Sequence, residues 1–391
     1  MVKNNKLLSY VLSINLIAML FNNHSALFIA DFYILLVIAC ALSVLYIITN
    51  ANKCTFNVYN TCAFFAFVVL ILMSFINKEI RDNGTFLSYV VWFALYISIS
   101  SFRLTPNNIN TIINGYILGA FICAILVFVL KIEYRTIGEY RYTIQVFNNV
   151  QIDPNYLGLF LLIPSLFLLK KIIKKPRKIL NWIVFAVILY GMFLTGSRAN
   201  LLAFFGALCF YIIDLFIKTN KKTRKRIYIL ICCALLVFVV LIQFLPPSVY
   251  DRFFHMNLFD TSNSLRLSHW KAALDAIKLR PLFGYGSAHT LDVLTKYANH
   301  RSDAHNTFLT LLIHFGIVGT VFFAIIFINI FYKLLKAKKI SEIGILFATF
   351  FVCLIIANHL GFTLWITIIL LQNIAGKIKK SEKLIVQGEL L

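Results

Sequence analysis

The residues best suited to chemistry lie in one polar segment, positions 246–303, between two apolar runs. This segment carries several arginines, four histidines and the glycine-flanked turn Gly284-Tyr285-Gly286. A fifth histidine, His305, follows directly, with Asn306 beside it. Arginine binds phosphate groups through paired hydrogen bonds, and histidine exchanges protons near neutral pH. The combination indicates a site that holds a phosphorylated substrate and moves a proton.

His305 is the candidate general base. We expect Asp303 to cap a helix that places His305 and Asn306 in its first turn. The positive end of the helix dipole disfavours a charged imidazolium, so the ring should be neutral and able to accept a proton from a hydroxyl group. The alternative is that His305 and Asn306 only cap the helix. His269, inside the polar segment, is the second candidate base.

Two further helix starts carry anion-binding signals. Asp153 and Pro154 combine a capping carboxylate with proline at the first helical position, and Asn155 follows. Ser197 is suited to cap another helix, with Arg198 in the first turn. Free N–H groups at helix starts, together with arginine, form a binding site for a polyanion such as pyrophosphate.

Metal chemistry has little support in the sequence. The polar loops contain no H-E-x-x-H motif, no D-x-D motif and no carboxylate pair at metal spacing. We therefore expect no metal and no cofactor. Arginines would then have to stabilise the charge on a leaving pyrophosphate.

Membrane helices must position these residues, because the chain is 60% hydrophobic and only 13% charged. The sequence predicts an all-α polytopic membrane protein in three parts: nine spans in 1–245, an external loop in 246–304, and three spans with a tail in 305–391. The expected spans of about 20 residues are 7–21, 26–49, 61–77, 86–101, 109–130, 156–169, 179–196, 199–217, 227–245, 305–332, 342–358 and 361–376.

The net charge of +22 reflects topology rather than nucleic-acid binding. Basic clusters fall in alternate short connections, at 170–178, 218–226, 333–339 and 377–383. The positive-inside rule places these connections and both termini in the cytoplasm, so the polar segment and the starts at Asp153 and Ser197 lie outside. All eight cysteines fall in spans or on the cytoplasmic side, so no disulfide framework is expected.

The external loop is expected to contain an amphipathic helix at 264–279. Apolar residues recur there at helical spacing, with Trp270 as the expected anchor in the membrane interface. Arg266 and His269 are three residues apart and should share a face. The alternative is an ordinary surface helix whose cations extend to water.

Few ionisable groups fall deep in the spans. Only His314 lies well inside, where a lone histidine is usually a packing residue. An ion-coupled transporter would place charged or broken-helix elements near the midplane, so their absence weakens a transporter hypothesis.

Four motifs in order along the chain resemble the O-antigen ligase/polymerase membrane superfamily. They are Asp153-Pro154-Asn155-Tyr156, Gly196-Ser197-Arg198-Ala199, positions 281–286, and positions 305–309 followed by 316–319. The chain is most similar to a Wzy-type polymerase of O-antigen or capsule. The resemblance implies a GT-C-like fold and a metal-independent glycosyltransferase in the bacterial inner membrane, acting on the external side.

The resemblance also implies roles for particular residues. Arg198 and Arg266 would bind the pyrophosphate of an undecaprenyl-linked glycan, His305 would activate the acceptor hydroxyl, and Arg141 would be a further contact. Asn155 and Asn306, which belong to the same motifs, are further candidates for binding the substrate or its pyrophosphate. A polymerase joins lipid-linked repeat units, whereas a ligase moves the finished polymer to lipid A–core. A polysaccharide transporter is the third alternative, and a chain-length regulator and a flippase are the expected partners.

Overall fold

The computed structural model describes residues 2–18, 30–49, 56–101, 104–136, 139–146, 150–218, 243–254, 261–357 and 360–376. The predicted span at 227–245 lies almost wholly outside these ranges, as do most of the basic cluster at 218–226 and all of that at 377–383. The helices are α1 (Val2–Ala18), α2 (Ala30–Thr49), α3 (Val58–Ile76), α4 (Asn83–Ser100), α5 (Pro106–Leu130), α6 (Pro154–Lys174), α7 (Ile179–Leu194), α8 (Arg198–Lys218), α10 (Pro247–Phe254), α11 (Thr261–Leu279), α12 (Thr290–Ala298), α13 (Thr307–Lys336), α14 (Ile340–Cys353) and α15 (Phe362–Ala375).

The described chain is a bundle of apolar helices. Six of them, α3, α4, α5, α6, α8 and α13, are long and apolar enough to cross a membrane, and α7, α14 and α15 are shorter apolar helices. The predicted apolar runs that fall in the described ranges are all helical. The protein is therefore a multi-pass membrane protein, while the full number of about twelve spans stays a prediction.

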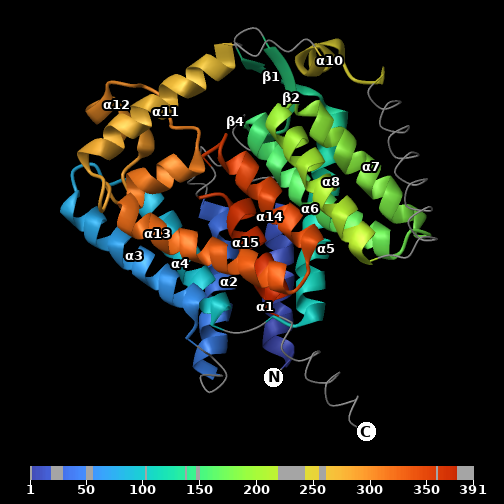
Figure 1. The fold of residues 1–391 in the computed structure, drawn as a ribbon, viewed down its shortest axis with the longest axis horizontal. Helices are drawn as coiled ribbons and strands as arrows, with labels where there is room; N and C mark the ends of the chain where they lie inside the picture. The colour runs from blue at the N-terminus through green and yellow to red at the C-terminus, as the bar shows by residue number, and fades with distance from the viewer. Residues whose placement is uncertain are drawn as a thin grey trace.

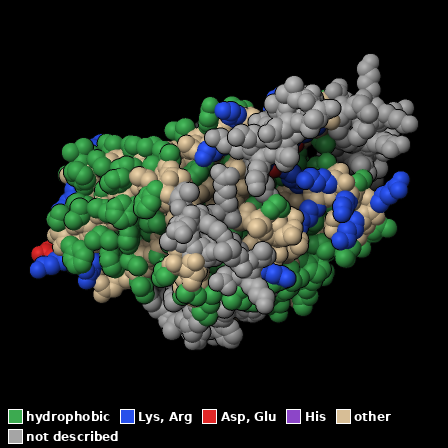
Figure 2. Space-filling view, turned by 90° about the horizontal axis from the view of Figure 1, so that it is seen from below, with side chains coloured by type: hydrophobic (Ala, Val, Ile, Leu, Met, Phe, Trp, Pro, Cys, Tyr) green, Lys and Arg blue, Asp and Glu red, His purple; other side chains and the backbone are tan. Residues whose placement is uncertain are grey.

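The two ends of the bundle differ in character (Figure 1). Helices α10, α11 and α12 and the hairpin of β1 (Ile132–Thr136) and β2 (Glu139–Thr143) gather at the top of the view, which we call the loop end. The start of α1 lies at the bottom. Figure 2 views the bottom from below and shows several groups of Lys and Arg side chains there.

Two of the predicted basic clusters, at 170–178 and 333–339, lie near each other at the end opposite the loop end. Lys170, near the end of α6, forms an ion pair with Glu342 at the start of α14. Lys333, near the end of α13, lies 4.4 Å from the ring centroid of Tyr59 at the start of α3. The clusters at 170–178 and 333–339 therefore lie at one end of the bundle.

The connection at 131–155 contains strands that the sequence analysis did not predict. The β1–β2 hairpin pairs Tyr134 with Arg141, and a second short pair joins β3 (Gln145–Val146) to β4 (Val150–Gln151). The all-α description is therefore incomplete at the loop end. Alternating Tyr, Arg and Thr side chains favour a strand when neighbouring strands offer cross-strand partners.

A clasp of backbone hydrogen bonds fixes the polar segment to the bundle. Helix α13 is broken at Gly316, where φ is +59° and ψ is −169°, so the expected absence of broken-helix elements within the spans is wrong. The motif at 281–286 enters this break: Tyr285 N donates to Ile313 O (2.7 Å), and Ile317 N donates to Pro281 O (2.8 Å). Two of the four motifs thus serve structure, because they satisfy backbone groups that the broken helix leaves open.

His314 lies beside the clasp and is fully engaged. Its Nδ1 is 2.7 Å from Tyr89 Oη, and its Nε2 is 3.1 Å from Thr290 Oγ1. The ring is buried, at 1% exposure. The expected packing role of His314 is confirmed, and it links α4, α12 and α13.

Candidate functional site

The starts of α6 and α8 lie side by side at the loop end. Asp153 accepts a hydrogen bond from Asn155 N (2.7 Å), which confirms the predicted cap with Pro154 at the first helical position. Ser197 Oγ donates to Asn155 Oδ1 (2.9 Å), and Asn200 Nδ2 donates to Asn155 O (2.9 Å). Motifs far apart in sequence are therefore joined through Asn155.

The start of α13 is held next to the start of α6 by the segment that follows α14. Tyr156 Oη donates to Ala357 O (3.0 Å), and Thr307 Oγ1 donates to the preceding carbonyl, Ile356 O (2.6 Å). Three helix starts, those of α6, α8 and α13, thus converge. Their positive dipole ends make this region favourable for an anion.

Two arginines meet at the turn before α8. Gly196 has φ +59°, and its carbonyl accepts a hydrogen bond from Arg252 Nε (2.7 Å). A Cβ atom added to Gly196 would lie 3.1 Å from Arg252 Cδ and 3.5 Å from Arg141 Cγ. Arg141 is buried, at 5% exposure, and Arg198 is half-buried two residues after Gly196. Arg141 and Arg198 were predicted as site residues, whereas Arg252 stood out in the sequence only as one of several loop cations.

The β1–β2 hairpin brings a carboxylate and a phenol to the same place. Burial and the carboxylate of Asp153 raise the pKa of Tyr134, and the guanidinium of Arg141 opposes them. Tyr134 therefore lies within electrostatic range of both groups. Strand β2, which carries Arg141, contacts α6, the helix that starts after Asp153.

A histidine cluster forms the second half of the site. His269 Nδ1 lies 2.6 Å from His300 Nε2, and the ring centroids of His269 and His305 are 5.3 Å apart. Ser302 Oγ is 3.4 Å from His269 Nε2. Both candidate bases are therefore neighbours, and His300 is a partner that the sequence analysis did not single out.

The cluster keeps His269 neutral at physiological pH. Burial, His305, His300 and Arg266 lower the pKa of His269 to about 4, against a smaller opposing effect of Asp303. The shift shows that Arg266 and the two other histidines lie within electrostatic range of His269. A neutral ring with a free electron pair has the form that a general base requires.

The predicted capping of the helix after the polar segment is wrong. Asn306 is the cap, because its side chain accepts from Phe308 N (2.9 Å) and Leu309 N (3.1 Å). Asp303 instead accepts from its neighbour Ala304 N (2.7 Å). The helix begins at Thr307, so neither His305 nor Asn306 lies in its first turn. His305 has a left-handed backbone conformation, with φ +46°. The amide of Asn306 stands closer to the apolar run and outcompetes the carboxylate for the cap.

The predicted amphipathic helix is α11, although its buried face differs from the predicted stripe. Ala273, Ala276 and Ile277 are buried, and Trp270 is half-buried. The sequence places Leu267, Trp270, Leu274 and Ile277 in one apolar stripe, but Leu267 and Leu274 are 64% and 48% exposed. The small alanines pack against the clasp, and the exposed leucines face outward, where the membrane interface would provide an apolar environment.

Among the described residues, no three His, Cys, Asp or Glu side chains are arranged to hold a metal ion. This observation does not test metal independence, which stays a prediction.

Part of the site, from Gly196 to Asn306, lies in a segment that matches a known family. The family model described as O-Antigen ligase matches residues 183–324, which run from α7 through the polar segment into α13. No curated protein matches the chain. The match makes this part of the chain similar to the O-antigen ligase family. The resemblance to the O-antigen ligase/polymerase superfamily is thereby confirmed over this segment.

Proposed function

We propose that the protein is a polysaccharide polymerase. It transfers a glycan from undecaprenyl pyrophosphate to a hydroxyl group of another lipid-linked repeat unit. The observation that carries this proposal is the convergence of three helix starts with Arg141, Arg252 and Arg198 on one side and His269 and His305 on the other. Anion binding and proton acceptance meet at one end of a membrane bundle.

The pyrophosphate of the donor lies at the helix starts. Converging N–H dipoles and the guanidinium groups of Arg198 and Arg141 favour its charge. Arg252, anchored on the carbonyl of Gly196, adds a third guanidinium to this group. Arg266 of α11 approaches from the histidine side. The apolar helices leave the lipid tails of both substrates in the bilayer, which fixes their orientation.

The reaction is a direct displacement. A hydroxyl oxygen of the acceptor sugar attacks the anomeric carbon of the donor, while His305 accepts the hydroxyl proton. The bond from the anomeric carbon to the pyrophosphate oxygen breaks, and the pyrophosphate leaves with the electron pair. The arginines stabilise the growing negative charge without a metal ion. Attack from the face opposite the leaving group inverts the anomeric centre.

The protein would reside in the bacterial inner membrane with the loop end outside and both termini in the cytoplasm. The positive-inside rule supports this orientation, because the basic ends of α6 and α13 lie together opposite the loop end. A flippase would supply the lipid-linked units on the outer side, and a chain-length regulator would act with the polymerase.

A ligase is the second candidate, favoured by the description of the matching family. Deletion of the chromosomal copy separates the candidates. Loss of a polymerase leaves single repeat units on lipid A–core, loss of a ligase leaves polymer on undecaprenyl pyrophosphate, and loss of a transporter leaves the lipid-linked substrate on the cytoplasmic side of the membrane. Undiminished polymer of normal length on its normal acceptor would overturn the proposal. Complementation with the wild-type copy is the control.

A further inference from the structure

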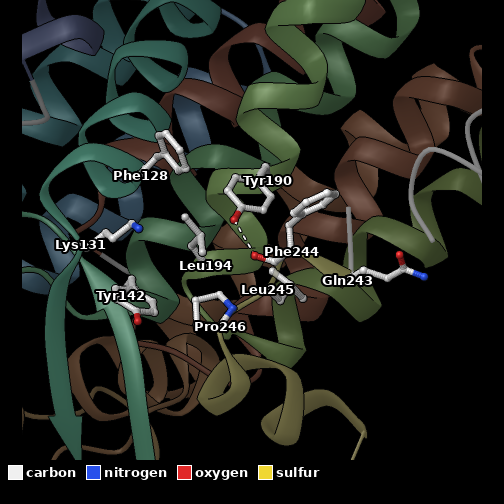
Figure 3. A pocket seen from close by; sticks show the side chains of 9 residues that line it. All are labelled: Phe128, Lys131, Tyr142, Tyr190, Leu194, Gln243, Phe244, Leu245 and Pro246. Carbon is white, nitrogen blue, oxygen red and sulfur yellow. Dashed lines mark hydrogen bonds between the residues drawn. The ribbon is translucent and has the colours of Figure 1, made fainter. Parts of the chain in front are cut away.

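A cavity of about 160 Å³ opens at the loop end between the end of α5, strand β2, the end of α7 and the chain leading to α10. We call it the aromatic cavity, and its walls include Phe128, Lys131, Tyr142, Tyr190 and Phe244 (Figure 3). An apolar cavity of about 150 Å³ holds one benzene ring. The aromatic cavity therefore has room for one six-membered ring.

The walls combine flat rings with polar groups. The rings of Phe128 and Tyr190 are 5.8 Å apart at 67°. Tyr190 Oη donates to Phe244 O (3.1 Å), which fixes the tyrosine ring. Lys131 Nζ lies 5.8 Å from the centroid of Phe128. Figure 3 shows the Lys131 amine and the Tyr190 hydroxyl pointing toward the middle of the group.

This chemistry fits a sugar ring better than a lipid tail. A pyranose presents C–H groups on its faces, which pack on aromatic rings, and hydroxyl groups at its edge, which bond to an amine or a phenol. A hydrocarbon tail offers no hydrogen-bond partner to the amine of Lys131 or the hydroxyl of Tyr190. A few fixed polar groups in an otherwise apolar wall are typical of small-molecule sites.

The aromatic cavity adjoins the arginines of the candidate site. Tyr142 follows Arg141 in strand β2, and successive side chains of a strand point to opposite faces. One strand therefore presents Arg141 to the turn at Gly196 and Tyr142 to the cavity. Leu245 and the chain after it run from the cavity wall into α10, which supplies Arg252.

We infer that the aromatic cavity binds one sugar ring of the glycan on which the protein acts. This inference rests on the proposed function, because the glycan is the substrate assigned there. A sugar subsite on the far face of β2 would hold the glycan while its reacting end lies at the arginines. It would therefore favour repeated transfer to the same chain.

Binding of simple sugars tests the subsite without catalysis. The probes are methyl glycosides of common hexoses and N-acetylhexosamines, added to purified protein in lipid nanodiscs and followed by saturation-transfer NMR. We expect saturable binding of at least one glycoside with a Kd of about 1 mM. Absence of saturable binding to the wild type would overturn the inference.

A matched pair of lysine variants locates the binding. Lys131 and Lys338 both have positive φ, at 45° and 50°, so Lys→Gly suits the backbone at either position. Lys131→Gly should weaken glycoside binding at least about tenfold, or 1.4 kcal/mol. Lys338 follows α13 at the end opposite the loop end, so Lys338→Gly should bind the glycoside as the wild type does. Equal binding by the two variants would overturn the inference.

Two further arms separate the possible failures. Undecaprenyl monophosphate should not displace the glycoside, and displacement would assign the aromatic cavity to lipid instead. Arg198→Lys should lose polymer formation and keep glycoside binding. If deletion stops polymerisation while Lys131→Gly binds normally, the subsite fails and the proposed function stands. If glycosides bind but deletion leaves polymer intact, the proposed function fails and the subsite stands as a sugar site.

Discussion

A Cβ atom added to Gly284 would lie 2.6 Å from the backbone nitrogen of Gly316. Both glycines have positive φ, at +70° and +59°, and their backbones cross where the polar segment enters the break in α13. The clasp therefore needs glycine at both positions for conformation and for space. It holds α11 and its histidine in a fixed position relative to the start of α13.

Gly284→Ala should destabilise the protein by about 3 kcal/mol or more, since a left-handed backbone and a backbone clash both penalise the methyl group. The measurement is the midpoint of thermal unfolding in detergent. Gly376→Ala is the control, because the nearest atom to an added Cβ there is Gln372 O at 3.5 Å and φ is −72°. Equal midpoints for the two variants would contradict the clasp.

Arg252→Lys should lower polymer formation at least about tenfold, because lysine lacks the planar fork with which Arg252, in the proposed mechanism, would bind both Gly196 O and a phosphate. Arg198→Lys should have a similar effect. The measurement is polymer made from lipid-linked repeat units by purified protein in liposomes. Arg177→Lys, an exposed change near the start of α7, should behave as the wild type. Full activity of both site variants would remove the arginines from the mechanism.

His305→Ala should abolish polymer while the protein still inserts and folds, because the acceptor hydroxyl then lacks its base. Polymer length in membranes and protein level by immunoblot are measured together. If the variant still makes polymer, the base is His269, and His269→Ala should then be the inactive variant. Activity in the double variant would rule out the histidine cluster as the base.

The His300 neighbour gives a prediction about pH. His269 has a pKa of about 4, so it is neutral above that value and gains a proton only as the pH falls toward 4. His300→Ala removes part of the burial and the electrostatic effect of His300, both of which lower the pKa of His269, so that pKa should rise toward 6.5. If His269 rather than His305 is the base, the acid limb of the pH–rate profile should therefore move to higher pH.

The control for that profile is His289→Ala, since His289 is exposed and makes no side-chain cap for α12. Its acid limb should coincide with that of the wild type. An unchanged acid limb in His300→Ala would show that His269 does not govern the rate.

The lowered pKa of His269 also has a consequence for stability. A histidine with a lowered pKa loses folded-state stability as the pH falls from 6.5 toward 4, because the unfolded chain binds the proton first.

The sequence predicted the helices of the bundle well because apolar length is a local property. The cap at Asp153 and the packing role of His314 were also predicted correctly, the first from a local pattern and the second from the usual behaviour of a lone buried histidine. The hairpin at β1 and β2 was missed because each strand is short and gains its stability from the partner strand.

The contacts that assemble the site could not be predicted from one sequence. Arg252 reaches Gly196 across 56 positions, and His300 reaches His269 across 31. Neither pairing follows from periodicity or capping, which act over a few residues. The motif at 281–286 was noticed as a tight turn, yet its role depends on the break at Gly316, a feature of the distant helix.

Asn306 offers a test of the corrected helix start. Asn306→Ala removes the side-chain acceptor for Phe308 N and Leu309 N and should lower the free energy of unfolding by about 1 kcal/mol. Asn306→Asp keeps an acceptor and should retain stability, because aspartate and asparagine cap equally well. Asp303→Ala should leave the helix start intact. Denaturant unfolding in detergent measures the order of the three variants. If Asn306→Asp is stable but makes no polymer, Asn306 also contacts the substrate. If Asp303→Ala destabilises the protein more than Asn306→Ala does, Asp303 is the cap.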